Sequence, residues 1–83
     1  MNISIQIPSI TDNIRMIESF IDNAKERFSL DDDIYGNIMI AVTEAVNNAI
    51  RHGNEGDKEK NVSLSLWLKD SSIEFLVKDE GKG

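Results

Sequence analysis

The residues with the clearest chemical potential lie between positions 44 and 52. Glu44, Asn48 and His52 are spaced four residues apart, so on a helix they form a slightly twisted column with rungs about 6 Å apart. Many neighbouring residues are apolar, so we expect Glu44 to be partly buried, with a raised pKa unless it is paired. Such a carboxylate beside a pocket can act as a general base. Asn48 offers a neutral amide oxygen, which suits Mg²⁺.

The same column is also typical of a helix face that simply points into solvent. In that interpretation His52 lies in the last turn of the helix and favours the negative end of its dipole. Spacing alone does not choose between a reactive column and a solvated one.

A second candidate is the segment Asp79-Glu80-Gly81-Lys82-Gly83, which directly follows a run of alternating apolar residues. The carboxylate of Asp79 could accept a hydrogen bond from a ligand amine, such as the exocyclic group of adenine. Gly81 and Gly83 have no side chains, which would let a ligand approach the main chain closely. A plain turn after a strand has a similar composition, so this segment is also ambiguous by itself.

The elements that must position these residues follow from apolar periodicity. Residues 2–7 alternate between apolar and polar and predict a strand with one buried face, which ends at Pro8. Apolar residues from Ile14 to Phe28 recur at steps of three and four and predict a helix, with Ser9 or Thr11 as its N-cap.

Ser29 and the three aspartates at 31–33 are predicted to open a second helix, because acidic side chains stabilise the positive end of a helix. Its apolar surface is broad, so we expect it to be central and covered on more than one side. Gly53 is the expected left-handed C′ residue, and residues 54–61 are expected to form an exposed loop.

Two further strands complete the predicted fold. Residues 62–69 and 73–77 alternate and predict an antiparallel pair joined by a tight turn at Asp70-Ser71. The order strand-helix-helix-strand-strand predicts an α+β two-layer sandwich, with both helices on one face of a mostly antiparallel sheet.

Composition limits the possible functions. The chain has 83 residues, which is at most one domain, and 15 acidic against 9 basic side chains give a net charge of −6. Direct nucleic-acid binding is therefore not expected, because phosphate backbones require an excess of Lys and Arg. The chain has no cysteine, no apolar run long enough for a bilayer and no visible secretory signal, so we expect a cytoplasmic protein without membrane contact.

Together, the two candidate segments resemble a known pair of motifs. Glu44-Ala45-Val46-Asn47-Asn48-Ala49-Ile50-Arg51-His52-Gly53 resembles the N-box of the Bergerat (GHKL) ATP-binding superfamily, and residues 79–83 resemble its G1 box. Within this superfamily of histidine-kinase-like ATPase domains, the chain is most similar to the bacterial anti-sigma-factor serine/threonine kinases. The resemblance extends along essentially all 83 residues.

The resemblance implies ATP and Mg²⁺ as cofactors and gives roles to individual residues. Glu44 would be the catalytic general base, and Asn48 would be the Mg²⁺ ligand. Cofactor binding would involve Asp79, Gly81, Gly83, Asn48 and His52. In this scheme Asp79 would accept the adenine amine, Gly81 would give the base room, and His52 would have a supporting role.

The implied function is that of an ATP-binding anti-sigma factor that phosphorylates a serine or threonine of an anti-anti-sigma antagonist. Its partners would be a sigma factor and that antagonist, and family members commonly form homodimers. The alternatives are another GHKL ATPase or a histidine kinase catalytic domain, or a truncated binding module without catalysis. The sequence does not specify which sigma factor or antagonist is bound.

One feature departs from the family pattern. Family members continue past the G1 box with an ATP lid, a second glycine-rich box, further strands and a helix, and none of these is present within residues 1–83. We therefore expect residues 1–83 to be a single partial domain, the N-terminal portion of an ATP-binding domain, and to be inactive as a kinase without the remainder.

Overall fold

A computed structural model describes residues 2–81 of the chain. A 3₁₀ turn, η1, precedes the first helix, and a π-helical segment, η2, continues the second. Gly83, one of the expected cofactor-binding residues, lies outside the described range. The elements in chain order are β1 (Asn2–Pro8), η1 (Thr11–Asn13), α1 (Ile14–Arg27), α2 (Asp32–Asn48), η2 (Ala49–Gly53), β2 (Asn61–Lys69) and β3 (Ser72–Lys78).

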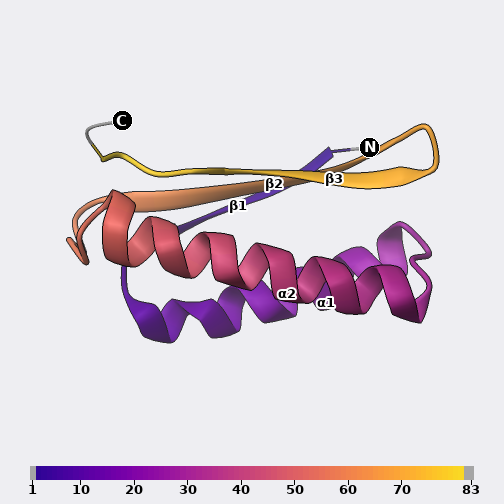
Figure 1. Ribbon diagram of the computed structural model, residues 1–83, viewed down its shortest axis with the longest axis horizontal. Helices are drawn as coiled ribbons and strands as arrows, with labels where there is room; N and C mark the ends of the chain where they lie inside the picture. Colours follow the sequence, from indigo (N-terminus) through magenta and orange to yellow (C-terminus); the bar gives the residue numbers. More distant parts are fainter. Residues whose placement is uncertain (1, 82–83) are drawn as a thin grey trace.

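The molecule has two layers, a sheet and a pair of helices on one of its faces (Figure 1). The three strands are antiparallel in the order β1-β2-β3, so β2 is central. The predicted α+β two-layer sandwich is therefore confirmed, and the strand boundaries differ from the prediction by one residue or less. Within the described range, the helices are too short or too polar to cross a membrane.

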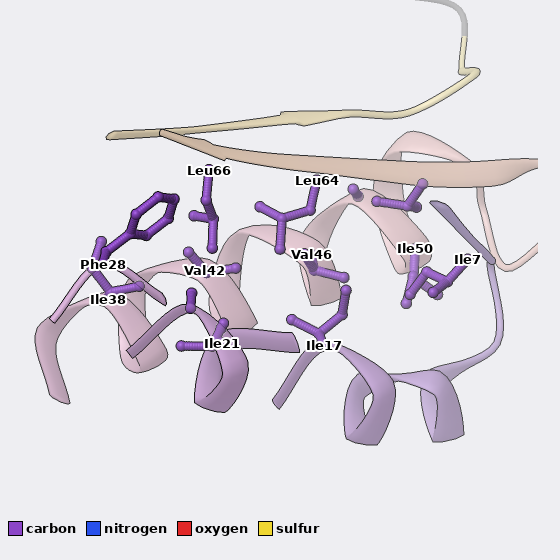
Figure 2. Packing of buried hydrophobic residues seen from close by; sticks show 13 residues of the cluster. Ile7, Ile17, Ile21, Phe28, Ile38, Val42, Val46, Ile50, Leu64 and Leu66 are labelled. Atoms are coloured by element: carbon purple, nitrogen blue, oxygen red, sulfur yellow. The ribbon is translucent and has the colours of Figure 1, made fainter. Parts of the chain in front are cut away.

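The hydrophobic core lies between the two layers (Figure 2). Ile7, Leu64 and Leu66 project from the sheet, and Val42 and Val46 of α2 meet them; all five are 0–1% exposed. Burial of each such side chain stabilises the fold by roughly 1.5–3 kcal/mol. This packing holds α2 against the sheet, and Figure 1 shows the C-terminal turns of α2 beneath the end of β3.

The N-terminus of α2 forms as predicted. Asp31 is its N-cap, and the carboxylate accepts a hydrogen bond from the Ile34 N–H at 2.8 Å. Asp32 lies in the first turn and pairs with Lys25 of α1 at 2.8 Å. The hydrogen bond from Lys25 lowers the pKa of the Asp32 carboxyl below its usual value. The Lys25 ammonium also lies 4.6 Å from the centre of the Tyr35 ring, so the same side chain joins the two helices twice.

The predicted N-cap of the first helix was wrong. Thr11 is the first residue of the turn η1, which precedes α1, so the cap position falls on Asn13, whose side chain makes no cap hydrogen bond. The Asn13 amide donates instead to the Pro8 carbonyl at 3.0 Å. Ser9 is buried, and its hydroxyl donates to the Lys60 carbonyl at 2.7 Å. Ser9 therefore serves a tertiary contact rather than the helix end.

Candidate functional site

The end of β3 meets the end of η2 through two glycines. A β-carbon on Gly53 would overlap with the carboxylate of Asp79, and a β-carbon on Gly81 would overlap with the Gly53 carbonyl. The Asp79 Oδ1 also accepts a hydrogen bond from the Gly81 N–H at 2.9 Å. The structure therefore brings the predicted residues Asp79 and Gly81 directly onto the last turn of the N-box-like segment.

Gly53 does not have the backbone conformation that was expected of it. Positive φ angles occur two and three residues later, at Glu55 (54°) and Gly56 (69°), and not at Gly53. The helical segment continues through Gly53 and ends at Asn54, which has a φ of −97°. The prediction of a left-handed C′ glycine at 53 was therefore wrong. Glycine is required at this position for a different reason, because a β-carbon would overlap with the Asp79 carboxylate.

Asn54 is a buried polar residue that the sequence patterns missed. Its side chain is fully buried, although residues 54–61 were expected to form an exposed loop. The Asn54 Nδ2 donates to the Ser9 Oγ at 2.8 Å and to the Asn61 carbonyl at 3.0 Å. Its Oδ1 accepts from the Glu80 N–H at 2.7 Å. The Asn54 amide thus connects the segments at the ends of all three strands. No local sequence pattern predicts these contacts.

Glu44 and Asn48 both lie on the exposed surface of α2. The expectation that Glu44 would be partly buried was therefore wrong. The cause is visible one turn earlier, where Ile40 is 67% exposed, so this flank of α2 faces solvent despite its apolar residues. Glu44 borders a shallow groove between α1 and α2, lined by Ile14, Glu18, Ile40, Thr43, Glu44 and Asn47.

His52 lies in the π-helical segment η2, beyond the end of α2. After Asn48 the helix widens, and the Asn54 N–H bonds to the Ala49 carbonyl, five residues back, at 2.8 Å. This π-type turn takes more residues than an α-helical turn, so the four-residue step from Asn48 to His52 no longer has α-helical geometry. Its side chain is exposed, which is consistent with a supporting role.

The metal-binding capacity of this surface is small. Within residues 2–81, no group of three or more His, Asp or Glu side chains is arranged to hold a metal ion. The exposed amide oxygen of Asn48 could supply one ligand. This donor set suits Mg²⁺, which commonly takes one or two protein oxygens and completes its coordination with water and phosphate oxygens.

The candidate site residues are therefore distributed along α2 and η2, which follow each other without a break. Glu44 and Asn48 are one turn apart in α2, and Gly53, which Asp79 contacts, ends η2 five residues after Asn48. The Asp79 carboxylate thus lies at the C-terminal end of η2. The neutral amide oxygen of Asn48 and the carboxylate of Glu44 lie earlier, in α2.

Comparisons with known proteins identify the family of the chain. A family model described as the histidine kinase-like ATPase domain matches residues 7–83. The chain is 46% identical over 46 residues to the anti-sigma F factor of Shouchella clausii (strain KSM-K16). It is 44% identical over 46 residues to the anti-sigma F factors of Bacillus cytotoxicus and of Bacillus thuringiensis. Each match covers 55% of this chain and 32% of the relative, so the chain spans about a third of their length.

Proposed function

Since the chain belongs to the histidine kinase-like ATPase domain family, we propose that it forms the ATP-binding part of an anti-sigma factor with serine/threonine kinase activity. The observation that carries this proposal is the contact of Asp79 and Gly81 with Gly53, which joins the G1-box-like and N-box-like segments. The similarity to anti-sigma F factors favours this branch over a histidine kinase or another ATPase of the family.

Asp79 is the residue that would recognise the base. Its side chain is exposed, and its Oδ1 is held by the Gly81 N–H. The second oxygen, Oδ2, lies against Gly53, close enough to overlap with a β-carbon there. In this proposal the exposed carboxylate would accept a hydrogen bond from an amine such as that of adenine. The lack of a side chain at Gly81 lets this segment approach the Gly53 carbonyl closely, and Gly83 would extend the same glycine-containing segment.

Asn48 and Glu44 would act on the phosphoryl end. Bound Mg-ATP supplies the phosphoryl group and the charge neutralisation that its transfer requires. The Asn48 amide oxygen would be a ligand of the Mg²⁺, and His52 would support that part of the site. The exposed Glu44 carboxylate would take the proton from the serine or threonine hydroxyl of a partner protein. Its exposure suits this role, because a protein substrate must reach it from outside.

The proposed partners are a sigma factor, which the protein would sequester in the cytoplasm, and the antagonist that it would phosphorylate. A homodimer is compatible with this scheme. A net charge of −6 favours protein partners over nucleic acid.

The proposal is tested first by ATP binding, measured by calorimetry with Mg²⁺ for the 83-residue chain. We expect Asp79→Ala to weaken ATP binding about 10- to 100-fold, because a hydrogen bond to a charged group is lost. The matched control is Asp12→Ala, which removes an exposed carboxylate in η1. Binding that is equal in both variants, or no binding by the wild type, would contradict the proposed nucleotide site.

Phosphoryl transfer is tested with the intact protein, Mg-ATP and its cognate antagonist. We expect Glu44→Ala to slow transfer by roughly 10²- to 10⁴-fold, the usual contribution of a general base. ATP binding should be retained, since Glu44 is not in the base-recognition segment. An unchanged transfer rate would remove Glu44 from the mechanism.

A further inference from the structure

We propose that Asn54 is a positioning residue that holds Asp79 and Gly81 in place and thereby sets the discrimination between purine bases. The inference rests on the proposed function, because it assumes that Asp79 recognises a base. It adds a residue that lies outside both motif-like segments and has no expected contact with a ligand.

The first step of the argument is the burial of Asn54. Its side chain is 0% exposed, yet its amide hydrogen-bonds to Ser9, Asn61 and Glu80. A buried amide that lost these partners would destabilise the fold, so the fully bonded arrangement specifies one geometry for every segment it contacts. Ser9 follows β1, Asn61 begins β2 and Glu80 follows β3. The three strand ends are therefore fixed relative to the end of η2.

The second step is the position of Glu80 between Asp79 and Gly81. The Glu80 N–H donates to the Asn54 Oδ1 at 2.7 Å, and the Glu80 carboxylate accepts a hydrogen bond from the Asn61 N–H. Both the main chain and the side chain of Glu80 are thus held. The peptide units on either side carry the Asp79 carboxylate and the Gly81 N–H that bonds to it. Asn54 therefore acts on the ligand-binding atoms through the Glu80 main chain.

The third step separates positioning from general stabilisation. Ser9 belongs to the same network, but it contacts Asn54 from the β1 side and bonds to Lys60, not to the segment after β3. Ser9→Ala removes one acceptor of the Asn54 Nδ2 and leaves the Glu80 hydrogen bond in place. Asn54→Ala removes all three contacts. Both changes weaken the fold, but only the second removes the hydrogen bond that holds the Glu80 main chain between Asp79 and Gly81.

The first experiment compares the dissociation constants of ATP and inosine triphosphate, in which a carbonyl replaces the amine at position 6 of the purine. The measured quantity is the ratio of the two constants in the wild type, Asn54→Ala and Ser9→Ala. We expect the preference for ATP to fall about tenfold in Asn54→Ala, equivalent to the loss of one charge-assisted hydrogen bond. It should stay within about twofold of the wild type in Ser9→Ala. An unchanged preference in Asn54→Ala, or an equal loss in both variants, would overturn the inference.

A second experiment needs no nucleotide. Hydrogen exchange of the Glu80 and Gly81 amides is measured by NMR and compared with exchange of amides in central β2. Asn54→Ala should accelerate exchange at these two amides by about tenfold or more relative to β2. The Glu80 N–H loses its acceptor, and the Gly81 N–H, which bonds to Asp79, is no longer positioned by a fixed Glu80 main chain. Ser9→Ala should change all sites in proportion. Absence of ATP binding by the wild type would refute the proposed function, whereas unchanged relative exchange in Asn54→Ala would refute the positioning role.

Discussion

The contact between Gly53 and Asp79 makes a quantitative prediction for a double-mutant cycle. Gly53→Ala adds a β-carbon that would overlap with the Asp79 carboxylate. The Asp79 side chain must then rotate away, which breaks the hydrogen bond from the Gly81 N–H to its Oδ1. This bond involves a charged group but is exposed, so its loss costs about 1.5 kcal/mol, the lower end of the usual range.

An opposing term comes from the backbone. Gly53 lies within a helical segment, where replacement of glycine by alanine stabilises by up to about 1 kcal/mol. The single change should therefore destabilise the protein by only about 0.5 kcal/mol. In an Asp79→Ala background the carboxyl group is gone, and only the β-carbon of residue 79 remains near the new methyl group, at 3.1 Å. A small shift relieves this contact, so Gly53→Ala should then be stabilising.

The predicted coupling between the two positions is about 1.5 kcal/mol. It is measured by urea unfolding of the four proteins, followed by far-ultraviolet circular dichroism, with the slope of the transition checked for constancy. A coupling below about 0.3 kcal/mol, within the usual error of additivity, would refute the contact. If Gly53 were instead a left-handed C′ residue, Gly53→Ala would cost about 1 kcal/mol in both backgrounds.

Two further predictions concern the hairpin and the helix pair. Asp70 and Ser71 have φ angles of 51° and 75°, as in a type I′ turn, so Ser71→Gly should stabilise by about 0.5 kcal/mol in urea unfolding. The control Ser72→Gly, in β3, should destabilise; stabilisation by both changes would contradict the turn assignment. Because Lys25 lowers the pKa of Asp32 in the folded state, the contribution of Asp32 to stability is present above the unfolded pKa of about 3.9 and is lost as the pH falls through the folded value. The urea midpoints of wild type and Asp32→Asn should therefore differ at neutral pH and converge in acid, and a difference that persists in acid would exclude this pair as the cause.

Periodicity predicted most of the fold because burial of one face imposes a repeat on each element. In the alternating run 62–69, Val62, Leu64 and Leu66 are buried as predicted, whereas Leu68 near the end of the strand is 42% exposed. The start of α2 was also predictable, since Asp31 caps it through a contact only three residues away. The alternation repeats along the strand and the cap is a contact between near neighbours, so both can be recognised from one sequence alone.

The predictions that failed concern contacts between distant segments. Ser9 and Asn54 are 45 positions apart, and Asn54 and Glu80 are 26 apart. Each of these polar residues has an ordinary local role, as a cap or as part of a loop, and no periodicity favours the tertiary role instead. The burial of Glu44 failed for a related reason. Its exposure depends on where α1 packs along α2, which the sequence of α2 alone does not determine.

The candidate site has two parts that are positioned by different forces, one by hydrophobic packing and the other by polar contacts between distant segments. Glu44 and Asn48 lie on α2, whose position is fixed by a hydrophobic core that does not involve them. Asp79 and Gly81 lie beyond the last strand and depend on the polar contacts of Gly53 and Asn54. Changes at Gly53 or Asn54 should therefore alter recognition of the base and leave the geometry of the α2 residues intact. Changes at Glu44 should act on transfer alone. Base recognition and phosphoryl transfer are thus expected to be separable by mutation, because different forces position the two halves of the site.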